Sequence, residues 1–390
     1  MAVDCLPGVR LAISVSAPHK ERQSLASIND LLSIINPQGQ YMLSSTRIFL
    51  RTVTQRTYSV NRQLPLSSNK TRPLVASSSS FLRSSVYIRS QFRTVTMAPL
   101  TKWNRLVRYV SAKDGQIHFG EPIVSDEKAD IDQLAREGQL NVKVLEGANF
   151  LQAEPTGAED TVKTLLGPLT PNDVPVIRCT GLNYKTHILE TGFDLPANPT
   201  LFIKPNQAVS DTNAAVPIPP LGQTHCDYEG ELTIVIGKNA KNVSEADALD
   251  YVAGYVSGND VSCRDWQMDK DKAGMMPQWS FSKSFDKYAP LGPCIVSTAV
   301  LGDAKGLRLQ TLVNGEVRQD SNTSDLCFGV RKLVSFFSTG QTLQAGSLIM
   351  TGTPGGVAMG MKPPKFLQDG DEVVVDIEGI GKVRNVMKFE

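Results

Sequence analysis

Two glutamates directly precede an apolar run near the middle of the chain. Glu229 and Glu231 are separated by one glycine, and the run Leu232-Thr233-Ile234-Val235-Ile236 begins immediately after them. Because successive side chains of a β-strand point to opposite faces, a strand here places both carboxylates on one face, while the apolar run holds the strand in a core. The alternative is an ordinary strand whose charged face meets solvent.

A third carboxylate, Asp260, follows about thirty positions later in Gly258-Asn259-Asp260-Val261. Three carboxylates favour Mg²⁺, Mn²⁺ or Ca²⁺ over Zn²⁺, because oxygen donors suit hard cations. His225 and Cys226 stand just before the glutamate pair. A thiolate does not match an oxygen ligand set, so we expect packing or surface roles for both.

Charge is distributed unevenly along the 390 residues, although the net charge is only +1. Residues 1–96 hold twelve Lys or Arg against three acids, whereas the remainder holds 28 basic against 36 acidic residues. A net acidic body argues against nucleic-acid binding. With 41% hydrophobic residues, the chain can bury a full core and form one main domain with appendages.

The basic segment 1–96 is rich in Ser and Arg, a composition typical of a mitochondrial transit peptide. Two alternatives remain: a disordered polar tail, or untranslated sequence preceding a true start at Met97, which would favour a cytoplasmic protein. The chain contains no run of eighteen apolar residues, so we expect no membrane span. Six scattered cysteines without a C-x-x-C motif indicate reduced, buried thiols and neither a zinc site nor a disulfide framework.

The remaining sequence predicts a β-rich α+β fold. We expect a hairpin within residues 103–124, a linker over residues 125–170, a strand at 177–181, a helix starting at Ser244 and stopping at Gly254, a hairpin turn at Asn314-Gly315, and strands at 372–377 and 382–386. The expected parts are the extension 1–96, a small N-terminal lobe with linker at 97–172, and a catalytic domain at 173–390.

Several polar residues are candidates for chemistry. His187 and Glu190 lie on one face if their segment is helical, so the carboxylate can orient the imidazole as a base; a structural histidine is the alternative. Lys283 lies among Trp279, Phe281 and Phe285, where an ammonium needs an anionic partner; the alternative is a surface lysine. Arg264 and Gln267 are candidates for holding a substrate carboxylate or a metal-bound water, although Arg264 could instead pair with Asp265 or Asp269. Backbone amides of residues 351–357 could form an anion nest.

Together with the carboxylates, five motifs resemble the fumarylacetoacetate hydrolase family over about residues 175–390. These motifs are Gly181-Leu182-Asn183-Tyr184-Lys185-Thr186-His187-Ile188-Leu189-Glu190, Phe202-Ile203-Lys204-Pro205, Trp279-Ser280-Phe281-Ser282-Lys283-Ser284-Phe285-Asp286, Pro290-Leu291-Gly292-Pro293 and Thr351-Gly352-Thr353-Pro354-Gly355-Gly356-Val357. The stretch Asp260–Met268 looks most like the mitochondrial, oxaloacetate-acting branch of the family.

The resemblance implies mixed β-sheets rolled around a metal site and a metal-dependent enzyme that hydrolyses carbon–carbon bonds in small 2-oxo or 2,4-dioxo acids. Oxaloacetate tautomerase or decarboxylase activity is the alternative, and a non-catalytic metal-binding scaffold is an alternative of another class. It implies a homodimer, and Mg²⁺ or Mn²⁺, with Ca²⁺ as a further option. It also implies roles for nine residues: metal ligands Glu229, Glu231 and Asp260; catalytic residues His187, Glu190 and Lys283; and substrate-binding residues Arg264, Gln267 and Thr353.

Two departures from the family pattern are visible. Cys263 occupies a position where the family usually has alanine, and this small change leaves the expected ligands untouched. The segment Val357-Ala358-Met359-Gly360-Met361 differs as well and can remodel one wall of the substrate pocket. The identity of the substrate is therefore open.

Overall fold

The computed structural model describes residues 100–126, 129–190 and 192–390, apart from the side chain of Glu190, and four short strands nearer the N-terminus. The chain divides into two compact units, Met1–Val95 and Thr96–Glu390. In the first unit two antiparallel pairs are described, β1 (Ala2–Asp4) with β2 (Arg10–Ala12) and β3 (Thr52–Gln55) with β4 (Arg83–Val86). The transit-peptide prediction for residues 1–96 otherwise lies outside the described residues.

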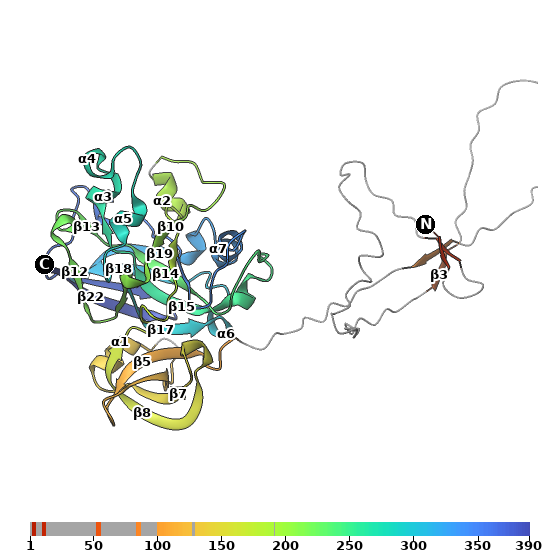
Figure 1. Ribbon diagram of the computed structural model, residues 1–390, viewed down its shortest axis with the longest axis horizontal. Helices are drawn as coiled ribbons and strands as arrows, with labels where there is room; N and C mark the ends of the chain where they lie inside the picture. The colour runs from red at the N-terminus through yellow and green to blue at the C-terminus, as the bar shows by residue number, and fades with distance from the viewer. Residues whose placement is uncertain are drawn as a thin grey trace, which may run out of the picture. The chain divides into compact units, whose positions relative to one another are not determined.

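A small four-stranded lobe opens the second unit (Figure 1). Its strands are β5 (Arg105–Ser111), β6 (Ile117–Pro122), β7 (Asn141–Glu146) and β8 (Glu154–Leu166). They pair antiparallel in chain order, and β8 also pairs with β5, which closes the lobe. The β5–β6 pairing confirms the hairpin predicted within residues 103–124.

The segment 125–170 is not the linker that its polar composition suggested, because it contains β7, β8 and helix α1 (Ile131–Arg136). The composition has a simple cause. In β7, Val142 and Leu145 are buried while Asn141 and Lys143 are exposed, so the strand contributes only one apolar face to the core. Half of its residues therefore resemble those of a loop.

The lobe continues into a larger mixed sheet. Strand β5 pairs with β17 (Ala289–Ser297), and the sheet then runs through β15 (Val252–Asn259), β14 (Gly230–Ile236), β20 (Leu348–Met350), β9 (Ile177–Cys179) and β10 (Phe202–Lys204). Strands β20 and β9 are parallel, as are β17 and β11 (Val209–Asp211). The strand predicted at 177–181 is thereby confirmed.

A second sheet packs against the first. Its order is β12 (Ala215–Ile218), β22 (Gly381–Phe389), β21 (Glu372–Ile377), β18 (Arg308–Val313) and β19 (Glu316–Asn322). Asn314 and Gly315 have φ angles of 49° and 80°, so the predicted tight turn joins β18 to β19. Ile234 of the first sheet and Val375 of the second belong to one buried apolar cluster.

The helix expected from Ser244 to Gly254 is not formed. Ser244 does bond to Asp247, as the capping pattern suggested, but only a short 3-10 turn follows, η5 (Ala248–Tyr251), and Val252 begins β15. The run from Val252 to Val256 is rich in β-branched and aromatic residues. It pairs with β14 along one edge and with β17 along the other, and every residue of β15 is buried. Tertiary pairing therefore outweighs the local helix signal.

Four short helices gather at one end of the sheets, at the top of Figure 1: α2 (Lys185–Glu190), α3 (Arg264–Met268), α4 (Lys270–Ala273) and α5 (Trp279–Lys283). Beside them, β13 (Cys226–Asp227) pairs with β16 (Ser262–Cys263). The other described helices are α6 (Thr298–Leu301), α7 (Val330–Phe337), η2 (Phe150–Gln152), η3 (Asn206–Ala208), η4 (Pro220–Gly222), η6 (Thr323–Asp325) and η7 (Ala358–Gly360).

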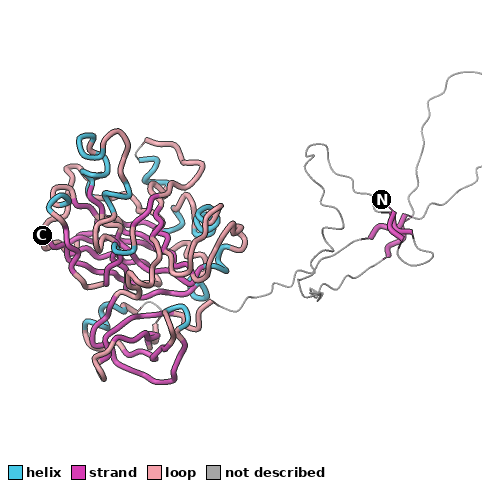
Figure 2. Tube along the Cα trace, viewed as in Figure 1, coloured by secondary structure: helices cyan, strands magenta, loops and turns pink. Residues whose placement is uncertain are grey.

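Strands dominate the second unit (Figure 2). This arrangement of mixed sheets and short helices confirms the β-rich α+β fold. Among the described residues, none of the helices combines the length and apolar character needed to cross a membrane.

Gly254→Ala should destabilise the fold by about 1 to 3 kcal/mol, because a new methyl group must be accommodated in a packed core. A Cβ at Gly254 would lie 2.3 Å from the carbonyl oxygen of Val296 on the neighbouring strand. Chemical denaturation measures the change in unfolding free energy. Gly360→Ala is the control, since the nearest atom to its Cβ would be 3.8 Å away; equal effects of the two variants would contradict the close approach of β15 and β17.

Candidate metal centre

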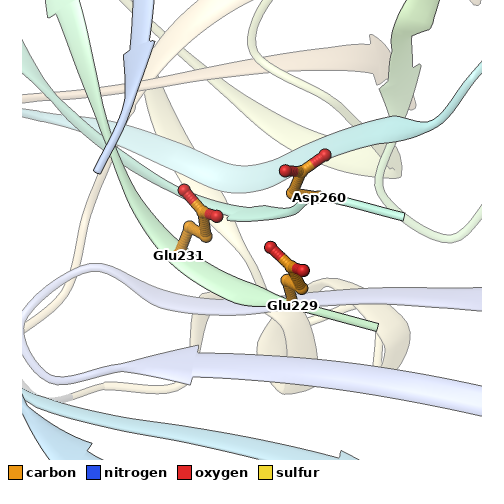
Figure 3. Close-up of side chains that lie close together, drawn as sticks. All are labelled: Glu229, Glu231 and Asp260. Carbon is orange, nitrogen blue, oxygen red and sulfur yellow. The ribbon is translucent and has the colours of Figure 1, made fainter. Parts of the chain in front are cut away.

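The antiparallel pairing of β14 with β15 brings three carboxylates together. Gly230 lies opposite Asn259, so the residues just beyond that pair, Glu229 and Asp260, are also opposed, and the Asp260 amide donates to the Glu229 carbonyl at 2.8 Å. Glu231 follows Glu229 by two positions and shares its face of the strand. Oxygen atoms of the three carboxylates lie within 4.8 Å of one another, and Figure 3 shows the side chains converging.

All three carboxylates are buried, with exposed fractions of 9% for Glu229, 1% for Glu231 and 0% for Asp260. Burying an isolated carboxylate is costly, and a cluster of them adds mutual repulsion. The chain therefore has to provide positive charge at this point. Three buried basic side chains do so: Lys204, Lys283 and Arg264.

Lys283 bridges two of the carboxylates from the end of α5. Its Nζ lies 2.8 Å from Asp260 Oδ2 and 2.9 Å from Glu229 Oε2, and it donates to Ser262 Oγ at 2.6 Å. Burial by itself would lower the pKa of Lys283, but the Asp260 and Glu229 carboxylates outweigh it and raise that pKa. The expected anionic partner of this lysine is therefore present, and a surface position is excluded.

Arg264 holds the outer side of the centre. Its Nε donates to Asp227 Oδ2 at 2.8 Å, and its Nη1 lies 2.7 Å from Glu229 Oε1 and 2.9 Å from Gln267 Oε1. Neither alternative partner is used: Asp265 pairs with His225 and Lys272, and Asp269 accepts from the Asp271 amide. The Nη2 atom of Arg264 is buried and has no hydrogen-bond partner among the described residues.

Lys204 is a component of the centre that the sequence analysis did not identify. It is fully buried, and its Nζ donates to Asp260 Oδ1 and to the Tyr288 carbonyl, both at 2.5 Å. Asp260 therefore has one ammonium group on each oxygen. A signal was available, since Lys204 is the charged residue in the motif Phe202-Ile203-Lys204-Pro205 and lies on the same strand face as the buried Phe202.

Asp227 was also overlooked as a component. It is fully buried and, besides bonding to Arg264, accepts hydrogen bonds from the amides of Tyr228, Ala358 and Met359. These bonds fix the carboxylate that orients Arg264. The centre thus depends on the loop after β20 as well as on the β14–β15 pair.

The two glutamates differ in their electrostatic surroundings. Burial opposes ionisation of Glu229, but Lys283 and Arg264 outweigh it and lower its pKa. Burial and the charges of Asp260 and Glu229 raise the pKa of Glu231 well above its ordinary value, and the Gly352 amide at 2.7 Å offsets this only in part. Glu231 is therefore the carboxylate with the least positive charge beside it.

This donor set fits a divalent cation. Four buried carboxyl groups, including Asp227, face three buried basic groups, so the cluster retains an excess of negative charge when all are ionised. Each carboxylate can accept about four hydrogen bonds or ligand bonds, so the contacts to Lys204, Lys283 and Arg264 leave acceptor sites on the same oxygens. Oxygen-only ligation is typical of Mg²⁺, Mn²⁺ and Ca²⁺.

The loop 351–357 lies against the centre but is not a vacant anion nest. Its Gly352 amide donates to Glu231. The Thr353 hydroxyl donates to the Gly230 carbonyl at 3.0 Å and accepts from the Gln319 side chain at 2.8 Å. The loop therefore braces the strand that carries the glutamates, and the substrate-binding role of Thr353 stays a prediction.

His187 and Glu190 both belong to α2, which confirms the helical segment on which their pairing depends. Thr186 of this helix bonds to Asp325, and Tyr184 before it forms a bridge to Leu326. His187 is half buried. The side chain of Glu190 lies outside the described residues, so the histidine–glutamate pair stays a prediction.

Comparison with known proteins places these features in context. Residues 176–388 match the family profile described as "Fumarylacetoacetate (FAA) hydrolase C-terminal". The chain is 38% identical over 305 residues to caffeoylpyruvate hydrolase from Neonothopanus nambi, covering 75% of this chain and 96% of that protein. It is 39% identical over 222 residues to the mitochondrial oxaloacetate tautomerase Fahd2a of Rattus norvegicus, covering 57% and 68% of the two chains.

The fold is likewise similar to solved structures. The crystal structure of 2-hydroxyhepta-2,4-diene-1,7-dioate isomerase from Mycobacterium marinum superposes with a TM-score of 0.59 and 34% sequence identity, covering 73% of this chain and 98% of that one. The structure of 5-carboxymethyl-2-hydroxymuconate delta-isomerase from Mycobacterium smegmatis gives a TM-score of 0.58 at 33% identity, with 73% and 100% coverage.

Lys204→Met should lower the unfolding free energy by about 3 to 5 kcal/mol, because it leaves a buried carboxylate with one partner fewer. The matched control is Lys388→Met, whose ion pair with Asp369 is exposed and is worth less than about 1 kcal/mol. Denaturant titration of both variants without added metal measures the difference. A Lys204 variant as stable as the control would show that this lysine does not compensate Asp260.

Proposed function

Because the chain belongs to the fumarylacetoacetate hydrolase family, whose members are hydrolases and isomerases, we propose that Glu229, Glu231 and Asp260 bind a divalent cation for chemistry on small 2-oxo or 2,4-dioxo carboxylic acids. The convergence of these three buried oxygen donors is the observation that carries the proposal. Mg²⁺ or Mn²⁺ is the proposed ion, with Ca²⁺ as a further option. The bound ion would supply Lewis-acid polarisation of the 2-oxo group.

The charge of the centre suits an anionic substrate. With a divalent cation added, three basic groups and the ion outweigh four carboxylates by one positive charge. A substrate carboxylate neutralises that excess. The buried and unpartnered Nη2 of Arg264 is the proposed donor to this carboxylate, with Gln267 holding the guanidinium in place. Thr353 is a further proposed substrate contact.

Lys283 is proposed to stabilise the negative charge that develops on the substrate. Its ammonium is held between Asp260 and Glu229, and its raised pKa keeps it protonated at neutral pH. A fixed ammonium in a site shielded from water stabilises a developing enolate more strongly than it would in solvent. Lys204, held by the Tyr288 carbonyl as well, is the second counter-ion of Asp260.

His187, oriented by Glu190, is the proposed base. It would remove a proton either from the carbon next to the 2-oxo group or from a water molecule that attacks a distal carbonyl. The first step leads to keto–enol tautomerisation. The second leads to cleavage of the bond between the attacked carbonyl carbon and the carbon that lies between the two carbonyl groups, and this carbon leaves as part of the enolate of the 2-oxo acid. Gly192, with a φ of 80°, follows α2 and provides the conformational freedom for this segment to close over substrate.

Hydrolysis of an acylpyruvate-type substrate is the first candidate. A cavity of about 410 Å³ is lined by Thr200, Leu201, Phe202, Pro277, Gln278, Trp279, Ser280 and Phe281, all uncharged. Phe202 connects it with the centre, because Lys283 Nζ lies 5.4 Å from the centroid of the Phe202 ring. An uncharged cavity suits the distal acyl group of a 2,4-dioxo acid better than a second carboxylate.

Oxaloacetate tautomerase or decarboxylase activity is the second candidate, supported by the similarity to the rat tautomerase. A non-catalytic metal-binding scaffold is the candidate of another class, and the presence of every expected ligand together with Lys283 and Arg264 argues against it.

A homodimer and mitochondrial import are further proposals. Mitochondrial import is supported by relatives named as mitochondrial proteins. The proposed parts of the chain are an N-terminal extension at 1–96, a small lobe with linker at 97–172 and a catalytic domain at 173–390. A cytoplasmic location is the alternative to mitochondrial import if translation starts at Met97.

Glu229→Gln should abolish tight binding of Mg²⁺ or Mn²⁺ and turnover of acetylpyruvate and oxaloacetate, because it removes a charged ligand while keeping the side-chain volume. Calorimetric titration of the ion and steady-state kinetics measure the two effects. Glu245→Gln is the control, since Glu245 is exposed and pairs only with Lys332 in the described structure. Metal-dependent activity in the Glu229 variant equal to the control would rule out the proposed centre.

His187→Ala and Glu190→Gln should keep metal affinity and lower kcat by about 10²- to 10⁴-fold, the size expected for loss of a general base. Substrate affinity should change little, because the substrate carboxylate and 2-oxo group are proposed to be bound by Arg264 and the metal ion rather than by His187. Kinetics with oxaloacetate, acetylpyruvate and fumarylacetoacetate, beside metal titration, separate these quantities. Loss of metal, or wild-type kcat on every accepted substrate, would make His187 a structural residue.

A further inference from the structure

Two cysteines face each other across the short strand pair beside the metal centre. In the antiparallel pairing of β13 with β16, Cys226 lies directly opposite Cys263. The Arg264 amide donates to the His225 carbonyl at 3.0 Å, so the neighbouring pair of residues, His225 and Arg264, is a hydrogen-bonded pair. Cys226 and Cys263 therefore form a non-hydrogen-bonded pair, in which the two side chains leave the same face.

This position has the geometry of a disulfide site. The Cα atoms of a non-hydrogen-bonded antiparallel pair lie about 4.5 Å apart. Disulfides form when that distance is about 4.4 to 6.8 Å. A pair of this type therefore lies near the short end of that range.

The two thiols are buried, and that of Cys263 contacts the short turn η4. Both cysteines are fully buried, and the Cys263 thiol donates to the Leu221 carbonyl at 3.6 Å. Leu221 belongs to the three-residue turn η4, and its own side chain is 41% exposed. The Tyr288 hydroxyl lies beside Gly222 of η4, 3.0 Å from the position that a Cβ would take on this glycine. This hydroxyl has no hydrogen-bond partner among the described residues. The reaction proposed below requires η4 to move aside so that a peroxide reaches Cys263.

We propose that Cys226 and Cys263 are a reversible oxidation site for peroxides. The sulfur of Cys263 attacks one peroxide oxygen, the O–O bond breaks, and Cys263 becomes a sulfenic acid as water leaves with the thiol proton. The sulfur of Cys226 then attacks the oxidised sulfur, the S–O bond breaks, and a second water leaves as the disulfide forms. Two thiols are oxidised by two electrons, and one peroxide is reduced.

Cys263 is assigned as the first to react because its thiol contacts the turn η4, where it donates to the Leu221 carbonyl. Burial raises the pKa of both thiols, but the amides of Trp266 and Asp265 offset part of the effect for Cys263. The raised values make the reaction slow compared with that of an exposed, activated thiol. The site therefore responds to sustained rather than brief exposure to peroxide.

Closing the bond acts on the metal centre through two neighbours. Asp227 follows Cys226, Arg264 follows Cys263, and these two side chains bond to each other while Arg264 also holds Glu229. Adjustment of the two strands to the disulfide geometry moves Asp227 and Arg264, and with them the Glu229 carboxylate that Arg264 holds. Oxidation should therefore weaken metal binding. The chemical step itself does not rest on the proposed function, because it needs only the two thiols.

The test exposes the reduced full-length protein to hydrogen peroxide and then analyses it by mass spectrometry after blocking free thiols. The expected result is a loss of roughly 2 Da, the mass of two hydrogen atoms, located in a peptide pair containing Cys226 and Cys263. Metal affinity should fall in parallel, and dithiothreitol should restore both. Cys327 is partly exposed and serves as an internal control for peroxide exposure. If Cys327 has become oxidised and the linked peptides are still absent, the proposal is overturned.

Two variants complete the test. Cys263→Ala should fold normally, show no link and keep its metal affinity under peroxide, whereas Cys294→Ala, which removes a buried cysteine outside the pair, should respond as the parent protein does. Equal loss of metal affinity in Cys263→Ala would contradict the assigned site. If the link forms while no variant or parent binds metal or turns over substrate, the oxidation site stands and the proposed function fails.

Discussion

The structure depends on compensating a cluster of negative charge within a β-sheet core. Asp227, Glu229, Glu231 and Asp260 are all buried, and no isolated carboxylate would stay ionised there. Lys204, Lys283 and Arg264 come from three separate elements to meet them. The geometry of β10, α3 and α5 around the sheet end is thus tied to one electrostatic requirement, and the region cannot rearrange without leaving charge unpaired.

That requirement also explains why the centre suits reaction chemistry. A purely structural cluster would match its charges. Here burial and the charges of Asp260 and Glu229 raise the pKa of Glu231, and Lys283 and the Gly352 amide offset this only in part. The unpartnered nitrogen of Arg264 is a second polar group that the protein itself does not satisfy. Groups left in this condition cost stability and are retained where a cation or substrate completes them.

Local sequence patterns predicted the secondary structure correctly where long-range pairing did not favour a different structure. The alternation around Val107 and Val110 and the Asn314-Gly315 turn predicted two hairpins correctly. The Ser244 signal failed because capping residues were followed by a segment that pairs on both edges. Residues 125–170 were misjudged as a linker because strands with one buried face have a loop-like composition. In each failure long-range pairing decided the outcome.

The sequence by itself determined that Glu229 and Glu231, two positions apart, share one strand face, because strand periodicity is local. The sequence also named Asp260 as a third carboxylate, but only the antiparallel pairing of β14 with β15 brought it beside the other two. The sequence likewise brought Lys283 and Arg264 forward as candidates. Only the tertiary structure decided that Lys204 and Asp227 complete the centre, and that Cys226 meets Cys263 across a strand pair. These relations join residues 37 to 56 positions apart along the chain, and pairing between distant strands is set by burial of the whole sheet rather than by any neighbouring residues.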